Sequence, residues 1–405
     1  MTTLETAAAA TSGSPAYPTR FRESEERSAR IAKPLRLLGR VTDVDEALMA
    51  RIGAGFLERD EVGHRLAEAM RLRADDPQRV PMGDFAARLA DPVAVPDAPP
   101  ALADFFATVE ATPDWVDLDL IAEAGRMQRR FGRNAADVLL QLSLIGGYRF
   151  GGPTDLLVAT GGLTGDMTRR RLAETQKWAV ALAQPDALLP YGEGWRLTVH
   201  VRAMHALVNH AFEPTWDVAR WGLPINQTDQ AATLGLFDGV LLLGARALGV
   251  PVTRRESQAV MHLWKYVGWL MGVDDLWLVD TERERHRLNY HLVLAQADIS
   301  AAGPQLAQSI ISTLRDLPRG AVRQERTLSM LTAFLGPRSM RELGLPVRVP
   351  WATAAAFVEN TVRYRVLGRG EAGRRRLEAW GDRVAAALLS DYYGGETVQD
   401  VGALR

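Results

Sequence analysis

The stretch that decides the fold is Trp195-Arg-Leu-Thr-Val-His-Val-Arg-Ala-Met-His-Ala-Leu-Val-Asn-His210, because its apolar residues recur with the period of an amphipathic helix. At roughly 100° per residue, His200 and His210 lie about 140° away from His205 on either side. His205 instead shares its side of the helix with mainly apolar residues, namely Thr198, Val201, Val208 and Phe212. The period therefore predicts that His205 points into an apolar interior.

A buried imidazole needs a partner on its nitrogens, either a hydrogen bond or a metal. One interpretation is a core histidine bonded to a backbone carbonyl. The other is a single metal ligand, because His200, His205 and His210 spread around the helix and cannot hold one small ion together. A lone helical histidine without a second protein ligand is typical of a haem site, where the porphyrin supplies four further donors.

Composition narrows the class of protein. The chain has 405 residues, 47% hydrophobic and 24% charged, with a formal net charge of -1, so no nucleic-acid footprint is indicated. It has no cysteine, which excludes disulfides, thiolate metal sites and cysteine nucleophiles. No apolar run reaches 18 residues and no signal peptide is recognisable, so we expect a cytoplasmic protein without stable membrane insertion.

The pattern along the chain predicts an all-α fold. Residues 1–34 are rich in Thr, Ser, Pro and Ala and are expected to form a flexible leader, followed by a single helical domain over residues 35–405. Proline and glycine separate segments of helical period, and no hairpin signal separates alternating apolar runs. The predicted helical segments are 40–72, 118–130, 135–145, 164–183, 196–212, 229–248, 254–271, 281–297 and 304–317, with two more between 352 and 389.

A second informative segment begins at Thr164, a candidate N-cap, and ends at Trp178. Within it Arg171, Thr175 and Trp178 are spaced i, i+4, i+7 and share one helix face. They form either a polar stripe along a site or a surface arginine beside a core tryptophan. Upstream, a glycine-rich turn ends at Asp155, whose carboxylate is expected to cap the next helix or to face a cavity.

These residues resemble the MpaB-type oxygenase family, which includes the latex clearing proteins. The resemblance runs from about residue 115 to 317 and rests on four motifs: Arg171-x-x-x-Thr175, Thr198-x-x-x-Arg202-x-x-His205, Asn226-Gln-Thr, and His262-x-Trp-Lys-Tyr-Val-Gly-Trp-Leu-Met-Gly-Val273. It implies a globin-like helical core with additional helices and one haem b. In latex clearing proteins such a site cleaves carbon–carbon double bonds of isoprenoid chains with dioxygen and yields carbonyl products.

The resemblance also implies roles for individual residues. His205 matches the proximal haem ligand, the one protein ligand to the metal, and Arg202 lies one turn before it. Arg171 and Thr175 match distal-side residues that act on oxygen or substrate, and Asp155 falls where latex clearing proteins place a catalytic glutamate. Further residues expected to contact or support the cofactor are Glu174, Trp178 and His210.

The function expected from this resemblance is haem-dependent oxygenation with O2, in which a carbon–carbon double bond of an isoprenoid, terpenoid or similar apolar small molecule is cleaved or oxidised. Two alternatives stay open: a haem enzyme that hydroxylates or peroxidises and leaves the carbon skeleton intact, and a non-catalytic protein that binds haem or an apolar ligand. Latex clearing proteins can offer a lysine as sixth haem ligand where this chain has Glu174, so we expect a five-coordinate or water-ligated iron. The missing export signal favours a diffusible substrate inside the cell.

Overall fold

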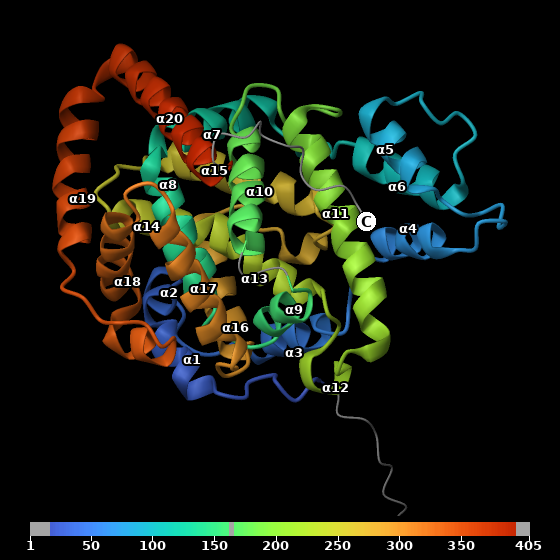
Figure 1. The fold of residues 1–405 in the computed structure, drawn as a ribbon, viewed down its shortest axis with the longest axis horizontal. Helices are drawn as coiled ribbons and strands as arrows, with labels where there is room; N and C mark the ends of the chain where they lie inside the picture. The colour runs from blue at the N-terminus through green and yellow to red at the C-terminus, as the bar shows by residue number, and fades with distance from the viewer. Residues whose placement is uncertain (1–16, 162–165, 394–405) are drawn as a thin grey trace, which may run out of the picture.

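The computed structural model describes residues 17–161 and 166–393, and every regular element within these ranges is a helix (Figure 1). The all-α prediction is therefore confirmed. The first part of the chain forms α1 (Glu25–Ile31), α2 (Lys33–Leu38), α3 (Glu46–Gly55), α4 (Glu61–Arg71), α5 (Met82–Ala90), α6 (Pro100–Glu110), α7 (Leu118–Phe131), α8 (Arg133–Val138), the π-helical η1 (Leu139–Ile145) and α9 (Pro153–Ala159).

The rest of the chain supplies the longer helices. They are α10 (Asp166–Leu182), α11 (Glu193–Phe212), η2 (Glu213–Thr215), α12 (Val218–Trp221), α13 (Gln227–Phe237), α14 (Gly239–Ala247), α15 (Arg254–Leu270), η3 (Asp275–Trp277), α16 (Glu282–Ala295), α17 (Ala302–Asp316), α18 (Gly320–Glu342), α19 (Trp351–Val362), η4 (Arg363–Leu367) and α20 (Gly370–Tyr393). The candidate N-cap Thr164 lies outside the described residues.

Helix α15 forms the centre of the main core. It begins with a capping box, in which the Thr253 hydroxyl accepts a hydrogen bond from the Glu256 amide and the Glu256 carboxylate accepts one from the Thr253 amide at 2.9 Å. Most of its later residues, including Trp264 and Tyr266, are buried. The helix packs against α7, α11, α13 and α16, so it is covered on several sides. The observed bounds of α15 differ from the predicted segment 254–271 by one residue at the C-terminal end.

Helix α11 is held to the body by a buried ion pair with the N-terminus of α4. The guanidinium of Arg202 donates from Nε to Asp60 Oδ2 at 2.7 Å and from Nη2 to Asp60 Oδ1 at 2.8 Å. The Arg202 and Asp60 side chains are 4% and 13% exposed. Gly63 and Gly272 leave room for this pair, since a Cβ atom on either would run into the Asp60 carboxylate. Two glycines thus permit a bidentate contact that joins α4 to α11.

A buried charge interrupts the segment that we expected to be one helix over 229–248. The backbone of Asp238 leaves the helical region, with φ -104° and ψ -85°, and separates α13 from α14. Its carboxylate accepts a hydrogen bond from Arg285 Nε at 2.7 Å, and neither side chain is exposed. The apolar period continues through Asp238, so the pattern could not reveal a break that depends on an arginine of α16.

The N-terminal region is more ordered than expected. The sequence predicts a flexible leader over residues 1–34, and for residues 17–34 this prediction is wrong. Helix α1 and the start of α2 lie in this segment, and both helices pack against α16. Arg20 is fully buried, forms an ion pair with Asp229 and lies 4.1 Å from the centre of the Phe56 ring. Partners more than thirty residues away in sequence therefore order this segment.

The sequence pattern also missed α18. This helix contains a kink at Gly336, where φ is 78° and ψ is 160°, followed by Pro337. Glycine and proline are the usual signals for a helix end, and they hid a segment that packs against α17 and α19. Among the described residues, no helix is both long and apolar enough to cross a lipid bilayer.

Removal of Asp60 should strongly destabilise the fold. Asp60→Ala leaves the buried Arg202 without its counterion, and we expect the free energy of unfolding to fall by about 3–5 kcal/mol. Chemical denaturation followed by circular dichroism measures this loss. The matched control is Glu371→Ala, which removes the partner of Arg375 in a pair with 65% and 83% exposure and should leave stability nearly unchanged. Equal stability of the two variants would contradict an anchoring role for Asp60.

Candidate functional site

His205 lies on α11 at the edge of the buried face, not at its centre. The face that packs against the body contains Arg202, Ala206 and Asn209, whereas His205 itself is half-buried. The predicted stripe does share one side of the helix, but only Thr198 in it is buried; Val201, Val208 and Phe212 are half-buried. The side of α11 that packs against the body is rotated away from this stripe, so His205 lies at the edge of the interior and does not point into its centre as the helical period predicts.

The imidazole of His205 is neutral at physiological pH. Its pKa is lowered to about 4, because burial and, to a smaller extent, the positive charge of Arg171 outweigh the negative charge of Asp60, which raises the pKa. Part of the ring surface stays accessible, yet protein atoms surround it closely enough for desolvation to dominate. Nδ1 is buried without a hydrogen-bond partner among the described residues. Nδ1 thus lacks the carbonyl partner that a structural histidine commonly has.

One side of the His205 ring borders a small polar pocket. Asp60, His64, Arg202 and Asn209 contribute to its wall, and it has room for about one water molecule. This is far below the volume of about 300–1,000 Å³ that small-molecule sites occupy. The polar pocket is therefore not the place for a large cofactor, and the half-buried apolar stripe of α11 that includes His205 is the better candidate.

Helix α10 faces this stripe. Figure 1 shows α10 and α11 running side by side in opposite directions, and Trp178 Nε1 donates to Thr198 Oγ1 at 3.0 Å. In an antiparallel helix pair, a residue that precedes the contact on one helix lies opposite the residue that follows the contact by the same number of positions on the other helix. Arg171 precedes Trp178 by two helical turns and His205 follows Thr198 by two turns, so their positions face each other across the pair. The effect of Arg171 on the His205 pKa agrees with this arrangement.

An aromatic cluster supports the contact between α10 and α11. The Trp178 ring meets Phe237 and Trp264 edge-on, with centroid distances of 5.5 and 5.6 Å. Phe237 and Trp264 stack at 4.9 Å. These rings come from α10, α13 and α15, so three helices meet behind the stripe. Trp178 is therefore a positioning residue in the structure, and a contact with a cofactor stays a prediction for it.

The remaining predicted site residues have local partners. Asp155 caps the start of α9, where its carboxylate accepts a hydrogen bond from the Gly152 amide at 2.9 Å. Glu174 accepts from Arg170 Nε at 3.0 Å and lies 3.7 Å from Arg171 Nη1. Thr175 is exposed, and its hydroxyl donates to the carbonyl of Arg171 at 3.0 Å. The structure thus brings Arg171, Glu174 and Thr175 together but gives Asp155 a place on a different helix.

His210 and Arg202 complete the set. The half-buried His210 ring lies 6.0 Å from that of His64, which in turn contacts Glu68 at 3.2 Å. Arg202 is occupied by Asp60 and by the carbonyl of Leu270 at 3.4 Å. Within the described residues, no group of three or more His, Cys, Asp or Glu side chains is arranged to hold a metal ion. A metal at His205 would accordingly need donors from outside the protein.

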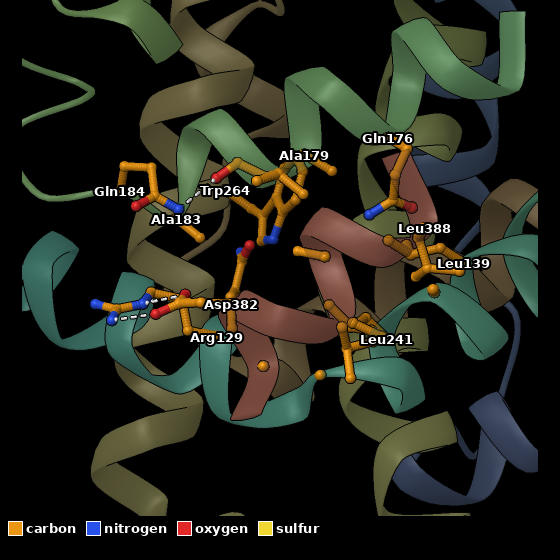
Figure 2. A pocket seen from close by; sticks show the side chains of 18 residues that line it. Arg129, Leu139, Gln176, Ala179, Ala183, Gln184, Leu241, Trp264, Asp382 and Leu388 are labelled. Atoms are coloured by element: carbon orange, nitrogen blue, oxygen red, sulfur yellow. Dashed lines mark hydrogen bonds and ion pairs between the residues drawn. The ribbon is translucent and has the colours of Figure 1, made fainter. Parts of the chain in front are cut away.

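Sequence reasoning missed an apolar pocket of about 60 Å³ beneath α20 (Figure 2). Its wall is formed mainly by small and aliphatic residues from α8, η1, α10, α14 and α20, with Trp264 of α15 and the polar Gln128 and Arg129 of α7. The buried Nε1 of Trp264 has no hydrogen-bond partner among the described residues. Because the lining comes from segments as far apart as Gln128 and Leu388, no local pattern could have indicated this pocket.

Comparison with known proteins agrees with this architecture. A solved structure described as latex clearing protein LCP in the closed state superimposes with a TM-score of 0.64 at 19% identity and covers 82% of this chain and 91% of that one, which shows a shared fold. The rubber oxygenase of Streptomyces sp. (strain K30) is 24% identical over 157 residues, or 38% of this chain. The match spans 39% of that relative's length.

The family described as ER-bound oxygenase mpaB/B'/rubber oxygenase, catalytic domain, matches residues 129–369, which is more than half of the chain. The match includes α10, α11 and α15, and therefore both helices that flank the half-buried stripe. This protein belongs to the MpaB and rubber oxygenase family.

Proposed function

We propose that this protein is a haem b-dependent oxygenase that uses dioxygen to cleave or oxidise a carbon–carbon double bond of an apolar isoprenoid or terpenoid substrate. The observation that carries the proposal is His205, whose imidazole is neutral and whose Nδ1 has no partner in the described part of the chain. Family membership supports the oxygenase class. The position of Arg171 opposite His205 supports a reaction site between α10 and α11.

The residues around His205 fit a haem. A neutral imidazole keeps a nitrogen lone pair for iron, and the half-buried Val201, Val208 and Phe212 offer apolar surface on the same side of α11. When bound, the haem would supply the iron that reacts with dioxygen. The ion pair of Arg202 with Asp60 would act indirectly, because it fixes the rotation of α11 and hence the direction of the His205 ring.

The polar side chains would hold oxygen atoms and move a proton. The Arg171 guanidinium has five N–H donors and lies on the face of α10 opposite His205, where it can orient a negatively polarised oxygen. The Thr175 hydroxyl can accept a further hydrogen bond while it donates to the Arg171 carbonyl. The Asp155 carboxylate would accept a proton from the substrate, in addition to its capping contact with Gly152.

The interior supports an apolar substrate. The pocket beneath α20 is lined largely by alanine, valine and leucine, and the aromatic cluster of Trp178, Phe237 and Trp264 separates it from the Thr198 side of α11. Such walls favour hydrocarbon over charged ligands, but at about 60 Å³ the pocket is itself below the roughly 300–1,000 Å³ of small-molecule sites, so it would hold only part of such a ligand. An unsaturated isoprenoid or terpenoid meets both requirements, because it is apolar and because its carbon–carbon double bonds can react in an oxygenase.

Loss of the His205 imidazole should abolish haem binding without unfolding the protein. We expect wild-type protein to bind one b-type haem and to show its visible absorption band, and His205→Ala to lose that band. The matched control is His200→Ala on the same helix, which should retain haem. Circular dichroism of both variants checks the fold. A His205→Ala variant that keeps the full haem band would remove His205 from the proposed role.

Haem affinity should stay nearly constant from neutral pH down to about pH 5. Because the pKa of His205 is lowered to about 4, protons compete with iron only as the pH approaches that value. An imidazole with the ordinary value would begin to lose affinity near pH 6.5. Haem titrations at a series of pH values measure the profile. A decline that starts at pH 6.5 would show that His205 is not desolvated as described.

Turnover should depend on Asp155 and Arg171 independently of haem content. Asp155→Asn keeps a carbonyl oxygen for the Gly152 amide but cannot accept a proton, so we expect turnover to fall about 10²-fold while α9 stays capped. Arg171→Ala should lose a similar factor and retain haem. Product analysis by mass spectrometry distinguishes two carbonyl fragments from one oxygenated skeleton. Wild-type turnover in Asp155→Asn would limit Asp155 to its capping role.

A further inference from the structure

The outer side of α19 and η4 exposes an unusual concentration of apolar side chains. Trp351 is 51% exposed, Val358 64% and Val362 50%. The exposed apolar residues in this region, here called the α19 face, are Trp351, Phe357, Val358, Val362, Val366 and Leu367. Scattered exposed hydrophobic residues need no explanation, but six of them within residues 351–367 are a concentration of the kind that marks an interaction surface.

Helix geometry shows why this face stays uncovered. Ala352, Ala356 and Asn360 follow each other at four-residue spacing and are buried against the body. Asn360 fixes that orientation, since its Nδ2 donates to Asn134 Oδ1 at 2.7 Å and to the Leu248 carbonyl at 2.8 Å. The opposite side of α19 must then point outward. Figure 1 shows α19 along the left edge of the molecule, away from α10 and α11.

The charge around the α19 face is strongly positive. Residues 347–376 contain seven arginines and two glutamates, although the whole chain has a formal net charge of -1. Both glutamates are already paired, Glu359 with Arg363 and Glu371 with Arg375. Within the described ranges, no ion pair is formed by four exposed arginines of this segment, namely Arg365, Arg369, Arg374 and Arg376.

We propose that the α19 face is a peripheral docking surface for a membrane with anionic headgroups. The apolar side chains would enter the boundary between headgroups and acyl chains, and Trp351 would sit at that interface as tryptophans commonly do. The free arginines would pair with lipid phosphates. A second copy of the chain would bring the same arginines without any free carboxylate in residues 347–376 to neutralise them, so it complements the face less well.

Docking through this face leaves the candidate oxygenase site accessible. Helix α20 begins next to the end of α19 and η4, and its later residues Gly381, Ala385 and Leu388 line the apolar pocket. The membrane would therefore contact α19, which precedes the helix that lines the pocket, whereas His205 lies on α11. The proposal does not rest on haem or on the reaction, and it can be tested on the haem-free protein.

Sedimentation with lipid vesicles tests the proposal. Full-length protein is mixed with vesicles of phosphatidylcholine alone or with phosphatidylserine added. We expect binding to the anionic vesicles, weaker binding to neutral ones, and loss of the difference in high salt. Val358→Asp and the double variant Arg365→Glu/Arg369→Glu should each weaken binding to anionic vesicles at least about tenfold.

The controls place substitutions of the same types elsewhere, with one arginine changed in place of two. Val93→Asp changes a valine that is 75% exposed between α5 and α6, and Arg73→Glu changes an arginine whose side chain is 90% exposed. Both should bind vesicles like the wild type. Absence of wild-type binding to anionic vesicles, or wild-type binding by Val358→Asp, would overturn the proposal. So would a wild-type dimer in light scattering that Val358→Asp dissociates, because it would show that a second copy covers the face.

Discussion

The hydrogen bond between Trp178 and Thr198 sets the register on which the candidate site depends. It joins α10 to α11, which form an antiparallel helix pair. The aromatic rings of Phe237 and Trp264 hold Trp178 in place. Since both helices are rigid, this one contact determines what lies two turns away. It places Arg171 across from His205 although they are 34 positions apart in the sequence.

Three influences determine the pKa of His205, and two of them lower it while one raises it. Desolvation favours the neutral ring, Arg171 on α10 acts in the same direction, and Asp60 at the start of α4 acts against it. Asp60 forms an ion pair with Arg202, and the positive charge of the guanidinium offsets much of the effect of the Asp60 carboxylate on the imidazole. The ion pair that anchors α11 therefore also keeps a nearby carboxylate from stabilising the charged form of His205. Structural support and electrostatic tuning come from the same two residues.

The apolar character of the molecule is divided between two places. The interior part is the pocket beneath α20 with the aromatic cluster beside it, and the exterior part is the α19 face. The helix pair α19 and α20 connects them, because α19 carries the exposed residues and α20 lines the pocket. The proposed substrate, a poorly soluble hydrocarbon, would benefit from apolar surface at both positions.

The sequence by itself determined the helical fold class and most helix positions, because apolar residues recur at helical spacing in α7, α11, α15 and α16. It also singled out His205, Arg171 and Trp178 through their spacing, and the motifs indicated the family. Tertiary structure decided three features that residue spacing does not reveal. They are the break at Asp238, the ordered conformation of residues 17–34, and the side of α11 that packs against the body. In each case the deciding partner is remote, such as Arg285 for Asp238 or Asp60 for Arg202. Apolar period defines a helix and its possible faces, but only contacts with distant segments select the face that is buried.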